Sequence, residues 1–259
     1  MPIWAGCPWT NGWPVFPIRD LNPTRITPVM TLALIAINVL VWLLWQPHGS
    51  VQDDVEFLYE RSAIACEVLM GRPLTFDEIN GQMCDPAASS GVAFPEKIPL
   101  ASLFVSMFLH GGLAHLLGNM WFLWLFGNNV EEAYGHLRYL AAYLVAGLVA
   151  TFGFVVLHPD NTTPLIGASG AIAGVLGSYL VLFPGKMVMS LAFFMVIPVP
   201  AVLFLGLWFL GQFAIGDAGV AWEAHVTGFV VGVVVAVVFR APLLARVRQV
   251  AASPRHARW

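Results

Sequence analysis

The sequence predicts an all-α, polytopic membrane protein with six membrane-spanning helices. Only 10% of its 259 residues are charged, whereas soluble domains carry about 25%. Hydrophobic residues make up 58% of the chain, and they gather in runs that approach the roughly 20 residues a helix needs to cross a bilayer. Three cysteines are too few for a disulfide-rich fold. We therefore expect the lipid bilayer to surround most of this chain.

The first span is predicted over residues 28–46, an apolar run interrupted by Thr31 and Asn38. Residues 1–27 precede it and are rich in Pro and Trp, so we expect a short cytoplasmic segment there. No basic region followed by an apolar run marks a cleavable signal, and the first span would then act as an uncleaved anchor.

Residues 47–100 form the one long polar stretch, with nine acidic and three basic side chains. Its acidic balance predicts a loop or small subdomain on the outer side of the membrane. Cys66 and Cys84 lie in this loop, and an oxidising outer compartment would allow them to form a disulfide. Two free cysteines are the alternative.

The five remaining spans follow one another, separated by short polar turns. They are predicted at about 113–126, 139–157, 166–183, 187–213 and 224–239. We treat residues 28–240 as one membrane domain and residues 241–259 as a basic cytoplasmic tail.

Lysine and arginine placement predicts the orientation of the spans. With the N-terminus inside, the inner segments hold nine of these residues and the outer segments hold three. Cytoplasmic loops carry such an excess, so both termini are predicted to be cytoplasmic. Neither half of the chain repeats the other, which argues against a transporter built from repeats.

Four polar side chains are predicted to lie at one membrane level near the outer face. Ser169 opens the fourth span in the motif G-A-S-G, and His225 opens the sixth span from the same side. His115 and Asn119 lie in the outer part of the second span. A serine beside glycines in a membrane helix is usually a packing residue, so the hypothesis depends on the whole group. Together they suggest a serine nucleophile with a histidine base.

His115 and Asn119 are four residues apart and share a helix face, so both can donate hydrogen bonds to an oxyanion beside the Ser169 amide. His110 and His115 diverge by about 140° on a helix, and no carboxylate or cysteine lies near them in sequence to complete a metal site. We expect no metal, no other cofactor and no nucleic-acid partner.

A third member of a Ser–His–Asp triad is not available within the spans. Asp217 and Glu223 lie in the last outer loop, and Glu223 could approach the ring of His225 only if the helix start is irregular. The sequence therefore favours a Ser169–His225 dyad, in which His225 accepts the serine proton and returns it to the leaving amine.

Small residues predict that the fourth and sixth spans pack closely. They fall on one side of each helix: Ser169, Gly170, Ala173, Gly174 and Gly177 on the fourth, and His225, Gly228 and Gly232 on the sixth. We expect Gly228 to face Ala173 or Gly174.

The chain resembles rhomboid-family intramembrane serine proteases of the minimal six-span type. The matching motifs are G-A-S-G at 167–170, H-G-G-L-A-H-L-L-G-N at 110–119 and A-H-V-T-G-F-V-V-G at 224–232. The resemblance implies Ser169 as nucleophile, His225 as base, and an oxyanion hole of His115, Asn119 and the Ser169 amide. Gly167, Gly170, His110, Gly228 and Gly232 would support the site.

The resemblance also implies membrane-spanning protein substrates and a fifth span that tilts to admit them. Pro198 and Pro200, inside that predicted span, would suit a mobile helix. A multi-pass protein of a bacterial-type plasma membrane is expected, and the oligomeric state is left open. Some members carry a tyrosine that stacks on the histidine; here Ala173 takes its place, and Ala101 and Ser102 replace a Trp-Arg pair.

Two alternatives belong to other classes. A rhomboid-like protein without catalysis could bind and escort membrane proteins, although loss of the serine or the histidine would be expected in it, and both are present. A channel or proton-coupled transporter would need ionisable groups in the middle of the membrane. The middles of the predicted spans contain none.

Overall fold

A computed structural model describes residues 15–88, 90–192, 194–215 and 221–253, and most of them are helical. The principal helices are α1 (Val29–Leu44), α6 (Leu113–Tyr134), α7 (His136–Leu157), α8 (Ser169–Leu182), α9 (Ala201–Ile215), α10 (Trp222–Val238) and α11 (Arg240–Ala252). Between α1 and α6 lie α2 (Val51–Arg61), α3 (Ala65–Met70), α4 (Phe76–Gly81), α5 (Pro99–Val105) and the 3-10 turn η1 (Ser106–Phe108).

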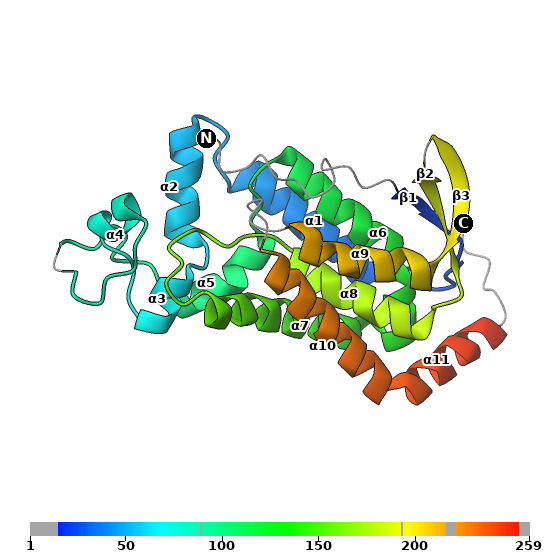
Figure 1. Cartoon of the computed structure of the whole chain (residues 1–259). Helices are drawn as coiled ribbons and strands as arrows, with labels where there is room; N and C mark the ends of the chain where they lie inside the picture. Colours follow the sequence, from blue (N-terminus) through cyan, green and yellow to red (C-terminus); the bar gives the residue numbers. More distant parts are fainter. Residues whose placement is uncertain (1–14, 89, 193, 216–220, 254–259) are drawn as a thin grey trace.

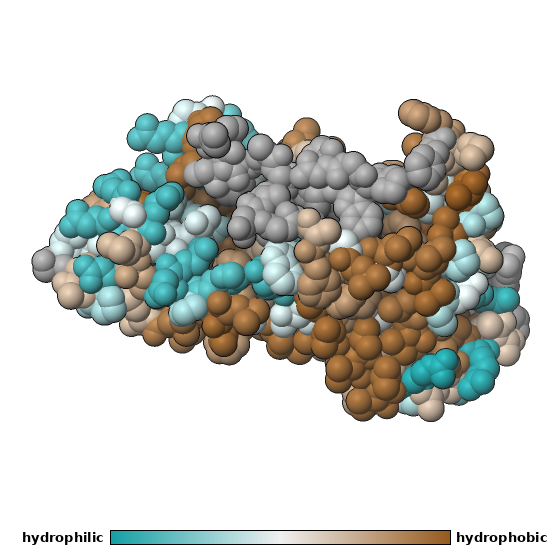
Figure 2. Space-filling view, in the orientation of Figure 1, coloured by the Kyte–Doolittle hydropathy of each residue, from teal (hydrophilic) through white to brown (hydrophobic). Residues whose placement is uncertain are grey.

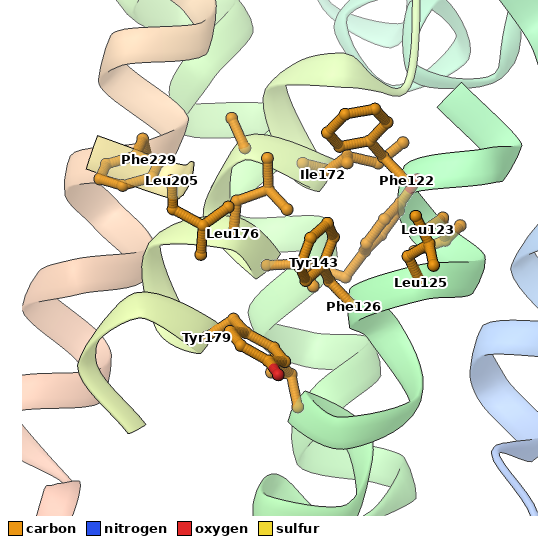
Figure 3. Close-up of a cluster of buried hydrophobic side chains, with 14 of the residues drawn as sticks. Phe122, Leu123, Leu125, Phe126, Tyr143, Ile172, Leu176, Tyr179, Leu205 and Phe229 are labelled. Carbon is orange, nitrogen blue, oxygen red and sulfur yellow. The ribbon is translucent and has the colours of Figure 1, made fainter. Parts of the chain in front are cut away.

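Helix α8 is the centre of the bundle, and α6, α7 and α10 pack around it (Figure 1). Its residues from Gly170 to Tyr179 are all buried. Figure 3 shows Phe126 of α6 beside Tyr179 of α8, and their ring centroids are 5.1 Å apart. Small residues on α8 let neighbouring helices approach, while its larger side chains fill the space towards α6.

The outward faces of α1, α7, α9 and α10 are apolar, and Figure 2 shows a hydrophobic surface over α9 and α10, in contrast to the mostly hydrophilic surface over α2–α4. Among the described residues, α7 alone is long and apolar enough by itself to cross a membrane. Residues 99–108 with α6, and α10 with α11, reach that length only as pairs bent by 75° and 76°. Helices α1, α8 and α9 are apolar but shorter.

The predicted fifth span, 187–213, is wrong in its first half. Strands β2 (Met187–Ala192) and β3 (Met195–Pro200) form an antiparallel hairpin, and the helix begins only at Ala201. Pro198 and Pro200 therefore lie before the helix and not inside it. Proline has no amide hydrogen to donate, so it is tolerated on an edge strand such as β3 and disfavoured inside a helix.

The N-terminal segment predicted over residues 1–27 contains a third strand, β1 (Val15–Asp20), which pairs antiparallel with β2. The sheet has the order β1-β2-β3 and lies at the opposite end of the bundle from α2–α4 (Figure 1). Trp121 of α6 donates a hydrogen bond to the Pro17 carbonyl at 2.8 Å. The beginning of the described chain is thus attached both to the hairpin and to α6.

The second predicted span extends further than expected, because its acidic end is helical. Glu131 accepts hydrogen bonds from the Met30 and Thr31 amides, and Glu132 accepts from those of Arg25 and Ile26. The first amides of α1 have no partner within their own helix, so Glu131 caps that helix from α6, while Glu132 holds the segment just before it. The polar turn predicted over 128–138 shrinks to Gly135.

The loop between α1 and α6, which we predicted to lie outside the membrane, is a small subdomain with its own apolar cluster, and the structure contains the Cys66–Cys84 disulfide. Arg72 binds the Glu78 carboxylate at 2.8 Å. Burial by itself would raise the pKa of Glu78, but hydrogen bonds from Arg72, from Thr75 and from the Asp85 amide lower it to about 2.

Candidate active site

Ser169 is the first residue of α8, and the chain before it turns sharply. Gly167 has a φ of 120°, a conformation that residues with a side chain rarely adopt. Its amide donates to the Ser106 carbonyl at 2.9 Å, which fixes the turn against η1. The Ser169 amide lies in the first turn of α8, where backbone donors have no partner within the helix. This end of the helix can stabilise negative charge.

His225 lies within hydrogen-bond distance of Ser169, with 2.8 Å between His225 Nε2 and Ser169 Oγ. The two helices that carry these residues meet through glycines. A methyl group added at Gly228 would overlap the carbonyl oxygen of Gly170, and one at Gly232 would overlap that of Gly174. A side chain at Gly228 would meet Gly170, one turn nearer the site than the Ala173 or Gly174 we expected, while the carbonyl oxygen of Gly228 does lie beside Gly174, 3.2 Å from a methyl group built there. The close packing of two backbones thus places the hydroxyl beside the imidazole.

Two side chains of α9 contact His225, and sequence reasoning missed both. Gln212 Oε1 lies 2.7 Å from His225 Nδ1, and the Trp208 ring lies 6.2 Å from the imidazole at a tilt of 34°. Gln212 is the one amide side chain within α9, which is the signal that could have identified it. Trp208 takes up the ring-to-ring contact with His225 that Ala173 cannot make.

Glu223 does not approach the His225 ring. Its carboxylate lies 2.8 Å from Nε2 of His158, at the end of α7. His158 is partly exposed and the carboxylate is mostly buried, so the pair joins the outer ends of α7 and α10 beside the cavity.

His115 and Asn119 project from the outer part of α6 into the same cavity as Ser169. Asn119 is 6% exposed, and its Nδ2 has no hydrogen-bond partner among the described residues. His115 Nδ1 faces the Gly111 amide at 3.4 Å, so the proton belongs on Nε2. A methyl group built on Gly167 would lie 2.9 Å from that Nε2. His115 Nε2 therefore faces the chain just before Ser169, and Asn119 offers an unpaired donor in the same cavity.

His110 supports this arrangement from behind. Its backbone amide donates to Gln46 Oε1 at 2.9 Å, and its carbonyl accepts from Gln46 Nε2 at 2.8 Å. The ring packs edge-on against His115, with centroids 5.2 Å apart. The end of α1 thereby holds the loop that leads into α6, and with it the position of His115.

The site residues line a cavity of about 570 Å³, within the range of small-molecule and substrate sites. Ser169, His225, His115 and Asn119 all contribute to its wall. The arrangement joins a hydroxyl, an acceptor for its proton and unpaired donors. These are the groups needed for attack on a carbonyl carbon with stabilisation of the resulting oxyanion.

Comparison with known proteins gives consistent matches. A Rhomboid domain model matches residues 99–242. The rhomboid protease GluP of Bacillus subtilis is 37% identical over 122 residues, which cover 45% of this chain and 23% of GluP. The putative rhomboid protease YdcA of Bacillus subtilis is 36% identical over 88 residues, or 33% of this chain and 44% of YdcA.

A mitochondrial relative also matches. The presenilin-associated rhomboid-like protein of Bos taurus is 33% identical over 90 residues, covering 34% of this chain and 24% of that protein. The matched regions span less than half the length of each of these three relatives. The matches therefore support one domain in common with these relatives and not similarity over their full length.

Proposed function

Because the chain belongs to the rhomboid family, we propose that it is an intramembrane serine endopeptidase that cleaves membrane-spanning segments of other proteins. The observation that carries this proposal is the 2.8 Å contact between Ser169 Oγ and His225 Nε2. Relatives in the family include GluP and YdcA, which are named as proteases.

In the proposed reaction Ser169 Oγ attacks the carbonyl carbon of the scissile bond while its proton passes to His225 Nε2. The carbonyl oxygen becomes negatively charged and is stabilised by His115 Nε2, Asn119 Nδ2 and the Ser169 amide. When the carbon–nitrogen bond breaks, His225 gives its proton to the leaving amine. Water then attacks the acyl carbon while His225 again accepts a proton. His225 returns that proton to Ser169 Oγ as the bond between the acyl carbon and Oγ breaks, which releases the second product and regenerates Ser169.

The six-span topology belongs to the same proposal. The family is a multi-pass membrane family, and the spans would be α1, α6, α7, α8, α9 and α10, with both termini cytoplasmic. Residues 28–240 would form the membrane domain, with the loop 47–100 outside and 241–259 inside. Two features support it: a hydrophobic surface covers α9 and α10 (Figure 2), and most of the lysines and arginines lie in the predicted inner segments. We place the protein in a bacterial-type plasma membrane.

Labelling with a fluorophosphonate probe tests the assignment, because the probe reacts with serines that a base activates. The purified wild type should be labelled and should cleave a model transmembrane substrate, and Ser169→Ala should do neither. Ser178→Ala is a matched control: it removes another buried serine of α8, one that bonds to Tyr134 and the Gly232 carbonyl. It should still be labelled. Undiminished cleavage by Ser169→Ala would reject the assignment as a serine protease. A wild type that is neither labelled nor active would favour a protein that binds and escorts membrane proteins.

A further inference from the structure

Gln212 is held in one orientation by its own helix. Its Nε2 donates to the Trp208 carbonyl one turn earlier, at 2.9 Å. A carbonyl oxygen can only accept, so the amino group of the side chain must point towards Trp208. The amide oxygen then points to His225, and it lies 2.7 Å from Nδ1. Gln212 is 2% exposed and His225 6%, so water does not compete for this contact.

This contact determines where the imidazole proton lies. The amide oxygen of Gln212 has no proton to give, so His225 Nδ1 must be the donor. The other ring nitrogen, Nε2, is then unprotonated and faces the Ser169 hydroxyl at 2.8 Å. Only this tautomer can accept the serine proton. In the opposite tautomer Nε2 would be a donor to Ser169, and two lone pairs would face each other at Nδ1.

No charged group among the described residues takes this role instead. The groups that face His225 are Ser169 from α8, Gln212 and Trp208 from α9, and His115 from α6. Glu223, the nearest carboxylate in sequence, is bound to His158. The structure therefore has a neutral amide in the place where a Ser–His–Asp triad has a carboxylate.

We propose that Gln212 is a positioning residue for His225, which holds the imidazole in its Nδ1–H tautomer and supports it when Nε2 gains the serine proton. The inference rests on the proposed protease function. It gives α9 a direct part in the chemistry, because the histidine lies on α10 and its orienting acceptor lies on α9. A neutral acceptor stabilises the imidazolium less than a carboxylate does, so the base stays weaker than in a full triad.

Three substitutions separate the possible roles. Gln212→Leu keeps the bulk and removes the acceptor, and Gln212→Glu restores an acceptor with a negative charge. Phe209→Leu is the matched control: Phe209 is one turn from Gln212 in sequence and stacks on Phe229 of α10 at 4.7 Å. It perturbs the packing of α9 against α10 and leaves the His225 contact intact. For each variant we would measure the pH dependence of kcat and KM for a transmembrane substrate, the fluorophosphonate labelling rate and thermal unfolding.

Gln212→Leu should lower kcat and the labelling rate by about tenfold to a hundredfold, the effect of leaving one buried donor unpaired, with little change in KM. Gln212→Glu should recover much of kcat. The acidic limb of its kcat–pH profile should move to higher pH, because a carboxylate beside Nδ1 stabilises the imidazolium. Phe209→Leu should lower the melting temperature without moving the acidic limb of the kcat–pH profile. Nitrogen-15 NMR of the ring should show Nδ1–H in the wild type and a mixture of tautomers in Gln212→Leu.

The inference is overturned if Gln212→Leu keeps the wild-type kcat and pH profile, or if Phe209→Leu at an equal loss of melting temperature slows labelling equally. Ser169→Ala, assayed beside these variants, keeps the two proposals distinct. If the wild type is active and Ser169→Ala is not, the protease assignment stands whatever the Gln212 variants do.

Discussion

Adding one methyl group at Gly228 should damage the site without changing any group that takes part in the chemistry. A Cβ built there would lie 2.9 Å from the carbonyl carbon of Gly170 and much closer to its oxygen, which is the limiting contact. Real Cβ atoms stay at least 3.0 Å from such atoms, so α8 and α10 would have to move apart by about 1 Å. Neither backbone can rotate away as a side chain would.

The displacement acts directly on the dyad, because Gly170 follows Ser169 and Gly228 lies three residues after His225. A separation of about 1 Å would stretch the 2.8 Å contact between the two side chains beyond about 3.2 Å, the limit of a useful hydrogen bond. A misplacement of about 1 Å can cost on the order of a hundredfold in rate. Overpacking should also lower the free energy of unfolding by about 1–3 kcal/mol.

Gly206→Ala provides the matched control for this experiment. It makes the same substitution in α9, where a new methyl group would meet no atom within 4 Å. We expect Gly206→Ala to cleave as the wild type does. Its melting temperature should equal or exceed that of the wild type, because alanine has a higher helix propensity than glycine. Cleavage of a transmembrane substrate and thermal unfolding should be measured on both variants in the same detergent. If Gly228→Ala cleaves at a rate within twofold of Gly206→Ala, the contact does not set the dyad geometry.

Three other outcomes can be measured on the same preparation. Asn119→Ala should lower kcat by about a hundredfold to a thousandfold with unchanged melting, as loss of one oxyanion donor does; equal loss of melting and activity would make its role structural. Glu78, with a pKa near 2 against an ordinary 4.5, stabilises the fold above pH 4.5 and loses that contribution as the pH falls towards 2. Glu78→Gln should therefore melt below the wild type at pH 7 and converge with it in acid. Alkylation without reductant should leave Cys66 and Cys84 unmodified, and reduction should cost about 3 kcal/mol for a bridge that spans 18 residues.

The position of the site within the chain could be predicted, because it depends on residues at the ends of apolar runs. Ser169 begins α8 and His225 lies in the first turn of α10, as the motifs indicated. Helical spacing of small residues also predicted that these two helices meet. Gly174 does lie beside the Gly228 carbonyl, but the residue that a side chain at Gly228 would meet, Gly170, was missed by one turn, since a helical wheel gives a face and not a depth.

Contacts between distant segments could not be predicted in this way. A run such as 187–200 is apolar apart from Ser190, so its periodicity does not separate a strand from a helix. Its pairing with 15–20 joins residues about 170 positions apart. Gln212 was missed because a lone amide in an apolar helix gives no sign of its partner. Likewise Glu131 looked like part of a turn, since the helix that it caps begins about 100 residues earlier.

The turn before β2, together with strand β3, holds the first residues of α9. The first two amides of α9, from Ala201 and Val202, donate to the carbonyls of Lys186 and Pro184 at 2.7 and 2.9 Å, and β3 holds the residues just before them. A swing of α9 would therefore pivot about these first residues. Gln212 lies eleven residues along it, about 16 Å from the pivot, so a swing of about 5° moves its amide by about 1.4 Å. That movement is enough to release His225. If a substrate enters by pushing α9 aside, the base loses its alignment during entry and regains it only when α9 returns. Admission and cleavage would then be successive events, and a bound segment that keeps α9 displaced would be held intact.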